Sequence, residues 1–74
     1  MLKLSKEGGL MNISTRRITV LMGAHLMTQS NLAETAGVSR ATINSALLKG
    51  SCSIQTAGKI AKALGVDPVD IIED

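Results

Sequence analysis

One pattern recurs five times along the chain and constrains its fold more than any other feature. In each case an apolar residue precedes a polar residue suited to an N-cap, and a second apolar residue follows four positions after that cap. This is the hydrophobic staple around a helix N-terminus, where the cap oxygen accepts a backbone N–H and the apolar pair fixes the chain's entry. The five occurrences are Ile13-Ser14…Ile18, Met27-Thr28…Leu32, Val38-Ser39…Ile43, Cys52-Ser53…Ala57 and Val66-Asp67…Ile71. They predict a compact, all-α bundle of five short helices.

The residues between these starts support the same prediction. Apolar residues follow at helical spacing, and Gly37, Gly50 and Gly65 stand where the second, third and fourth helices would end. Pro68 after the Asp67 cap favours a fifth helix of one or two turns. No run of β-forming residues alternates cleanly, so the sequence predicts no strand.

Composition and charge narrow the class of protein. The 74 residues suffice for one small domain, and none is aromatic, which argues against binding of single-stranded nucleic acid by base stacking. Residues 1–66 carry all eight Lys and Arg but only two acids, a net charge of +6, whereas residues 67–74 carry four acids and no base, −4. This excess of positive charge over residues 1–66 is expected in a protein that binds a polyanion with one face.

The N-terminal segment is read as separate from the domain. Residues 1–11 are predicted to be a disordered tail, with the domain over residues 12–74. Two origins of the tail remain open: an ordinary flexible extension, or a translated leader ahead of a start at Met11, because Lys6-Glu7-Gly8 can be encoded by a bacterial ribosome-binding sequence. A single cysteine, no signal peptide and no apolar run long enough to span a bilayer predict a cytoplasmic protein with no membrane partner.

The second and third predicted helices are separated only by Gly37-Val38-Ser39, a short turn with glycine that is typical of a helix-turn-helix. The segment TQSNLAETAGVSRATINSALLKG resembles the Cro/repressor-type helix-turn-helix family, the lambda-repressor-like or XRE-like DNA-binding domains. The matching residues are Thr28-Gln29, Leu32-Ala33, Ala36 to Arg40, Thr42-Ile43 and Lys59 to Val66. The resemblance covers roughly residues 14–72 and implies the five-helix fold, major-groove binding and a role in transcriptional regulation.

The sequence departs from the family pattern at three places. Leu26 stands where the family often has glycine, Met22-Gly23 where an arginine is common, and Lys49-Gly50-Ser51-Cys52 contains no proline. The path of the connection after the third helix is therefore left open, together with the phosphate contacts usually made from it.

The third helix, from about Ser39 to Lys49, is the expected recognition helix. If Ile43, Ala46 and Leu47 face the core, the base contacts are expected from Arg40, Ala41, Asn44 and Ser45. Arg40 could pair with guanine and Asn44 with adenine, while Ala41 is small enough for close approach or for contact with a thymine methyl. Phosphate contacts are expected from Thr28, Gln29, Ser39, Thr42, Lys49, Arg16 and Arg17.

The expected function is sequence-specific binding of a double-stranded DNA operator by a transcriptional regulator, with repression favoured. A weak homodimer through the region of Ile71 and Ile72 would place two half-sites about 34–36 Å apart. The alternative is a protein-interaction module, such as an antitoxin or adaptor, in which DNA binding is secondary. Binding of structured RNA is a further rival that the missing aromatic residues disfavour.

The remaining chemistry-bearing residues do not form a catalytic or metal-binding pattern. His25 has no Cys or acid at ligand spacing and is expected to pack, partly buried, at the end of the first helix. Cys52 is expected to pack as a small apolar residue. The acids Asp67, Asp70, Glu73 and Asp74 are expected to serve as helix caps and a solvated tail. The sequence predicts no enzyme, cofactor, metal or small-molecule ligand.

Overall fold

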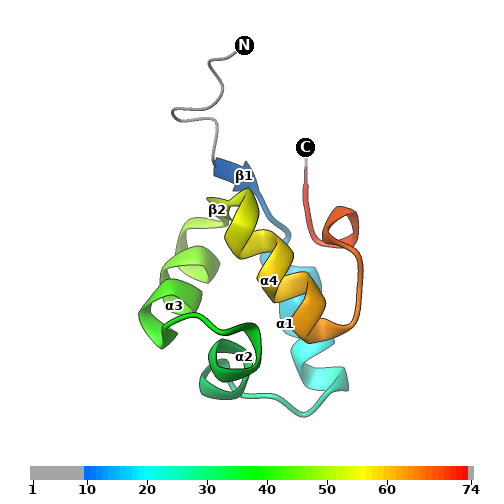
Figure 1. The fold of residues 1–74 in the computed structure, drawn as a ribbon. Helices are drawn as coiled ribbons and strands as arrows, with labels where there is room; N and C mark the ends of the chain where they lie inside the picture. Colours follow the sequence, from blue (N-terminus) through cyan, green and yellow to red (C-terminus); the bar gives the residue numbers. More distant parts are fainter. Residues whose placement is uncertain (1–9, 74) are drawn as a thin grey trace.

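The computed structural model describes residues 10–73 of the chain. Four helices and a two-stranded ribbon form a mostly helical domain, with the ribbon at one end and the α1–α2 connection at the other (Figure 1). The elements are β1 (Leu10–Asn12), α1 (Thr15–Ala24), α2 (Gln29–Ala36), α3 (Arg40–Lys49), β2 (Ser51–Ser53), α4 (Ile54–Leu64) and the single 3-10 turn η3 (Pro68–Asp70). None of the helices within residues 10–73 is long and apolar enough to cross a membrane.

All five expected N-caps are confirmed. The side chains of Ser14, Thr28, Ser39 and Ser53 each accept a hydrogen bond from the backbone N–H three residues on, at 3.0–3.1 Å. Asp67 occupies the N-cap position of η3 without a hydrogen bond to its side chain, and its own N–H donates to Asp70 Oδ2. The repeated staple therefore marks the helix starts correctly.

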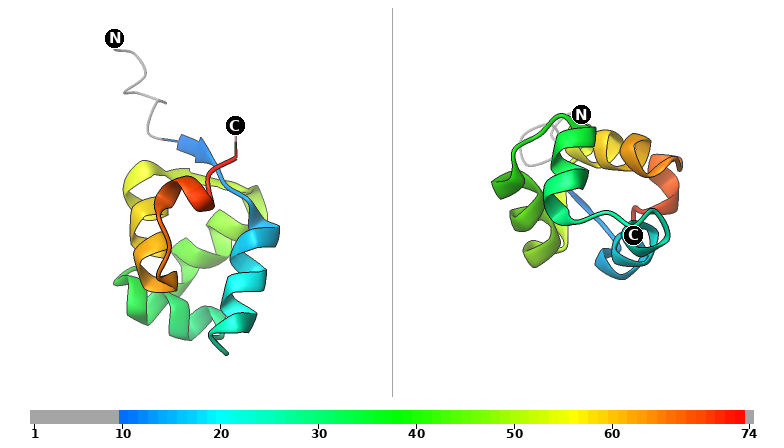
Figure 2. Two further views of the ribbon diagram at one scale, coloured as in Figure 1. Left: turned by 90° about the vertical axis from the view of Figure 1, so that its right-hand side faces the viewer. Right: turned by 90° about the horizontal axis from the view of Figure 1, so that it is seen from below.

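The fifth helix is a correction, because Pro68–Asp70 forms only one 3-10 turn. The chain leaves the helical path at Ile71, whose carbonyl accepts the N–H of Ser14 at 2.7 Å. The N–H of Glu73 then donates to the carbonyl of Asn12 at 2.8 Å, and Ile13 and Ile72 form an isolated bridge. This pairing with residues 12–14 competes with a longer helix, and Figure 2 shows the red C-terminal segment beside the blue segment that leads from β1.

The prediction that the chain has no strand is also wrong. Leu10–Asn12 pairs antiparallel with Ser51–Ser53, with Met11 opposite Cys52. Leu10 and Met11, assigned from the sequence to the tail, thus belong to the folded domain. The rest of the expected tail and the question of a leader concern residues 1–9, which lie outside the described residues. The ribbon also supplies the path between α3 and α4 that the sequence left open.

The core consists of aliphatic side chains together with Met22 and Cys52, and it centres on α4. Ile60 and Leu64 of α4 are fully buried, and α4 packs against α2, η3 and both strands. The other fully buried large side chains come one each from α1, α2, α3 and the segment after η3: Ile18, Leu32, Ile43 and Ile71. Ile71 is therefore a core residue, and it cannot form the dimer surface that was expected to include it.

The α1–α2 connection holds Leu26 in a conformation that suits glycine. Leu26 has φ +56° and is the only non-glycine residue with positive φ among residues 10–73, and its side chain is 90% exposed. A left-handed backbone costs a residue with a Cβ about 1–2 kcal/mol, and the exposed side chain recovers little of that cost by packing. The departure from the family's glycine at this position is thus a local strain in the fold.

Replacing Leu26 with glycine is expected to stabilise the domain. Relief of the strained backbone outweighs the entropy that glycine adds to the unfolded chain, so the free energy of unfolding should rise by about 0.5–1 kcal/mol. The melting temperature measured by circular dichroism should rise by about 2–8 °C. Leu48→Gly is the matched control, because Leu48 is also largely exposed but is helical, and this change should lower the stability by about 1 kcal/mol. A lower melting temperature for Leu26→Gly would contradict this account.

Candidate nucleic-acid interface

The turn between α2 and α3 sets the relative position of the two helices. Gly37 ends α2 in a left-handed conformation, with φ +77°, and its N–H donates to the carbonyl of Ala33 at 2.9 Å. Val38 is half-buried against the core, and Ser39 caps α3. The expected three-residue turn is therefore present, and it places the N-terminus of α3 beside α2.

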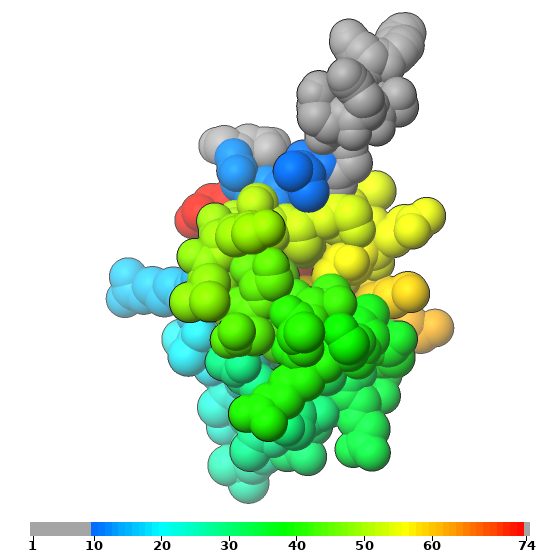
Figure 3. All heavy atoms as spheres, turned by 90° about the vertical axis from the view of Figure 1, so that its left-hand side faces the viewer, coloured from blue at the N-terminus to red at the C-terminus, as the bar shows by residue number. Residues whose placement is uncertain are grey.

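The outer face of α3 is the side that does not meet the core. Ile43 and Ala46 are buried, whereas Arg40, Ala41, Asn44, Leu48 and Lys49 are exposed, and Thr42 and Ser45 are half-buried. Figure 3 shows this side of the molecule, with α2 and α3 in green across its lower and central parts and the start of α4 in yellow above. We call the seven non-core residues named here the α3 face.

Two hollows flank the α3 face. Arg40, Ala41 and Asn44 share the first with Gln29, the first residue of α2. Ala41, Thr42, Ser45 and Lys49 line the second, on the side of the ribbon. Between them, these hollows gather all four expected base contacts and three of the seven expected phosphate contacts.

The second hollow also contains residues that the sequence did not point to. Its opposite wall is formed by Leu10, Ser51, Cys52, Ser53 and Thr56, from both strands and the start of α4. The hydroxyls of Ser53 and Thr56 hydrogen-bond to each other at 3.0 Å. The cap signal at Ser53 was visible in the sequence, but the ribbon that brings these residues to α3 was not.

Several of the expected phosphate contacts are already engaged within the domain. Thr28 caps α2, with a reciprocal hydrogen bond from its own N–H to Asn31 Oδ1 at 3.1 Å. Ser39 Oγ caps α3 and lies 2.8 Å from Thr42 Oγ1. The Thr28 hydroxyl only accepts in its cap, so its O–H can still donate to an anion, as can the backbone N–H groups at these helix starts.

The two arginines of α1 lie differently. Arg16 is exposed and lines a hollow with Asn12 and Gly50, next to the end of α3. Arg17 Nη1 donates to the carbonyl of Asp70 at 3.0 Å, in a hollow formed by α1 and the C-terminal turn. The structure does not bring Arg17 together with the residues of the α3 face.

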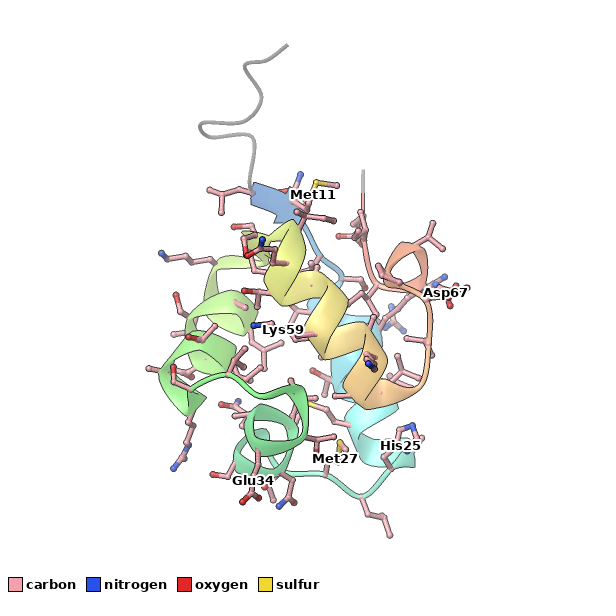
Figure 4. All side chains as sticks on the ribbon, in the orientation of Figure 1. Met11, His25, Met27, Glu34, Lys59 and Asp67 are labelled. Atoms are coloured by element: carbon pink, nitrogen blue, oxygen red, sulfur yellow. The ribbon has the colours of Figure 1, made fainter. Side chains whose placement is uncertain are left out.

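The remaining titratable residues support the packing. His25 is more exposed than the sequence suggested, and its Nε2 donates to the carbonyl of Leu64 at 2.9 Å, which ties the end of α1 to the end of α4 (Figure 4). Cys52 is buried as expected, and burial raises the pKa of its thiol. Within residues 10–73, no three His, Cys, Asp or Glu side chains gather as a metal site would require.

Comparison with known proteins gives one family. The model of the Cro/C1-type HTH DNA-binding domain matches residues 17–74, which includes α2, the turn and α3. Neither the search of curated proteins nor that of solved structures returned a significant match.

Proposed function

Because the chain belongs to the Cro/C1-type HTH DNA-binding domain family, we propose that it is a sequence-specific regulator of transcription, acting as a repressor by occupying an operator. The observation that carries this proposal is the gathering of Gln29, Arg40 and Asn44 around one hollow at the N-termini of α2 and α3. Polar readers at the start of a recognition helix, beside a helix N-terminus that can meet a phosphate, are what major-groove recognition needs.

The proposed base contacts follow from the chemistry of the first two turns of α3. The Arg40 guanidinium can donate two parallel hydrogen bonds to guanine O6 and N7, and the Asn44 amide can pair with adenine N6 and N7. Ala41, lying between them on the α3 face, allows the helix to approach the bases closely. Ser45, half-buried, adds a short hydroxyl donor or acceptor.

The proposed phosphate contacts surround these readers. The N-terminus of α2, with Thr28 and Gln29, and that of α3, with Ser39 and Thr42, present backbone N–H groups and partial positive charge. Lys49 and Arg16, both exposed near the C-terminal end of α3, add full charges. Arg17 would reach a phosphate only by leaving the carbonyl of Asp70.

A helix-turn-helix domain that binds as a pair reads two half-sites and so gains specificity. We therefore include a weak homodimer in the proposal, formed through a surface other than that of Ile71 and matched to half-sites about 34–36 Å apart. Sedimentation of the protein with its operator should show two chains per duplex. If only a single chain bound a palindromic operator, the proposed dimer would be wrong, but the proposed base contacts would still stand.

The experiment that tests the proposal is selection of bound duplexes from a random pool, followed by titration of the winner and of scrambled DNA at several salt concentrations. A specific regulator should prefer its site by about 10³-fold or more. Weak binding that disappears with salt and shows no preferred sequence would overturn the proposal. That result would favour a protein-interaction module. If structured RNA displaced the DNA, it would favour an RNA-binding protein instead.

The contribution of Lys49 can be separated from sequence readout. Lys49→Ala is expected to weaken binding to selected and scrambled duplexes by the same factor, because a phosphate contact carries no sequence information. It should also reduce the slope of log affinity against log salt by about 0.9. Lys59→Ala is the charge-matched control, since Lys59 lies on α4 and lines a different hollow with Thr35 and Ala36 (Figure 4). A slope that falls equally in both variants would argue against a local contact at Lys49.

A further inference from the structure

Leu48 is the one large apolar residue of the α3 face, and the expected base contacts do not include it. Its side chain is 78% exposed, although it is one of the larger apolar residues of the domain. It follows Asn44 by four residues and Arg40 by eight, and residues at these spacings share one side of a helix. Leu48 therefore continues the row of Arg40 and Asn44 by one further helical turn, on the side away from Ile43 and Ala46.

A single exposed leucine needs no explanation on most surfaces. Here Leu48 lies in line with Arg40 and Asn44, which are proposed to face bases. An apolar side chain at this position would meet the base edges of the major groove. Among these base edges, only thymine presents an apolar group, the C5-methyl. Leucine can bury that methyl, whereas it can form no hydrogen bond to the other base edges.

We propose that Leu48 reads a thymine in the operator by packing against its C5-methyl group, an inference that rests on the proposed function. With a rise of about 1.5 Å per residue, Leu48 lies about 12 Å from Arg40 along the axis of α3. Successive base pairs are separated by about 3.4 Å. The thymine is therefore at most three to four base pairs from the guanine bound by Arg40, because α3 is inclined to the duplex axis, and it lies towards the C-terminal end of α3 and the ribbon.

The test removes the methyl from the DNA and the side chain from the protein in turn. Each thymine of the selected operator is replaced singly by deoxyuridine, which deletes only the C5-methyl, and affinities are measured for the wild-type protein and for Leu48→Ala. One replacement, at the expected spacing, should weaken wild-type binding about three- to fivefold, the effect of one buried methyl. The same replacement should change the affinity of Leu48→Ala by less than about 1.5-fold, because the partner of the methyl is gone.

The controls isolate the contact. Leu26→Gly also lacks an exposed leucine, but Leu26 lies in the α1–α2 turn, so this variant should keep the full response to deoxyuridine. Circular dichroism should show Leu48→Ala folded, since an exposed helical leucine contributes little to the core. A response that persists in Leu48→Ala, or a selected site with no sensitive thymine at that spacing, would overturn the role of Leu48 alone. A pool that yields no preferred site would overturn the proposed function with it.

Discussion

Arg40→Ala is expected to lower the affinity for the selected operator by about tenfold to a hundredfold, the largest effect of any single change on the α3 face. A bidentate pair between arginine and guanine is worth about 1–3 kcal/mol of discrimination. Arg40 is the exposed first residue of α3 and lines a hollow with Gln29. No hydrogen bond within residues 10–73 holds its guanidinium, which is therefore available to a base. The loss should be concentrated at one G·C pair, so that repeating the selection with the variant yields a site relaxed at that position only.

Arg40→Lys distinguishes geometry from charge. Lysine keeps the positive charge but lacks the planar fork that matches guanine O6 and N7. The variant should bind scrambled DNA with the wild-type affinity and salt dependence, yet lose most of the preference at the same G·C pair. If Arg40→Lys retained the full preference, or if Arg40→Ala weakened operator and scrambled DNA equally, Arg40 would be a phosphate contact and not a base contact.

Ile71→Ala is expected to unfold much of the protein at room temperature. The side chain is completely buried, and removing a buried isoleucine costs about 2–5 kcal/mol, including the cavity left behind. A domain of this size has only a few kcal/mol of net stability to lose. Denaturant titration of Ile71→Val, which should cost about 0.5–1.5 kcal/mol, gives a measurable value for a variant that still folds.

Val69→Ala provides the control for this effect. Val69 lies two residues earlier, in η3, and its side chain is 74% exposed, so its removal should change the stability by less than about 0.5 kcal/mol. An Ile71→Ala protein that kept its stability but lost self-association would reinstate the surface role expected from the sequence. The structure assigns Ile71 to the core, and the two outcomes are separated by unfolding and sedimentation on the same samples.

Local signals in the sequence were sufficient to predict where α1 to α4 begin. The N-cap side chains of α1 to α4 each act through a hydrogen bond only three residues away, and Gly37 ends α2 through a carbonyl four residues back. Such interactions are encoded within a few consecutive residues, so the staple and the glycine could be recognised without knowing the rest of the fold. The turn between α2 and α3, and with it the approximate position of Arg40, was predictable for the same reason.

Contacts between distant segments were not predictable. Leu10–Asn12 is too short to show an alternating pattern, and it becomes a strand only because Ser51–Ser53 is available some forty residues later. Ile71 was expected in a dimer surface because nothing nearby in sequence indicates that its backbone pairs with Ser14. The same limitation hid the wall of the second hollow at Ser51 and Ser53, and the hydrogen bond from Arg17 to the carbonyl of Asp70.

The pairing of Glu73 with Asn12 has a consequence for the chain as a polymer. The hydrogen bonds from Ser14 to Ile71 and from Glu73 to Asn12 hold the first and last parts of the described segment, residues 10–73, next to each other, at the end of the domain where β1 lies in Figure 1. A short peptide link that joined these two parts of the chain would add no contact to the folded protein. It would, however, shrink the ensemble of unfolded conformations, as a disulfide does across a long loop. Cyclisation is therefore expected to raise the free energy of unfolding without changing the α3 face.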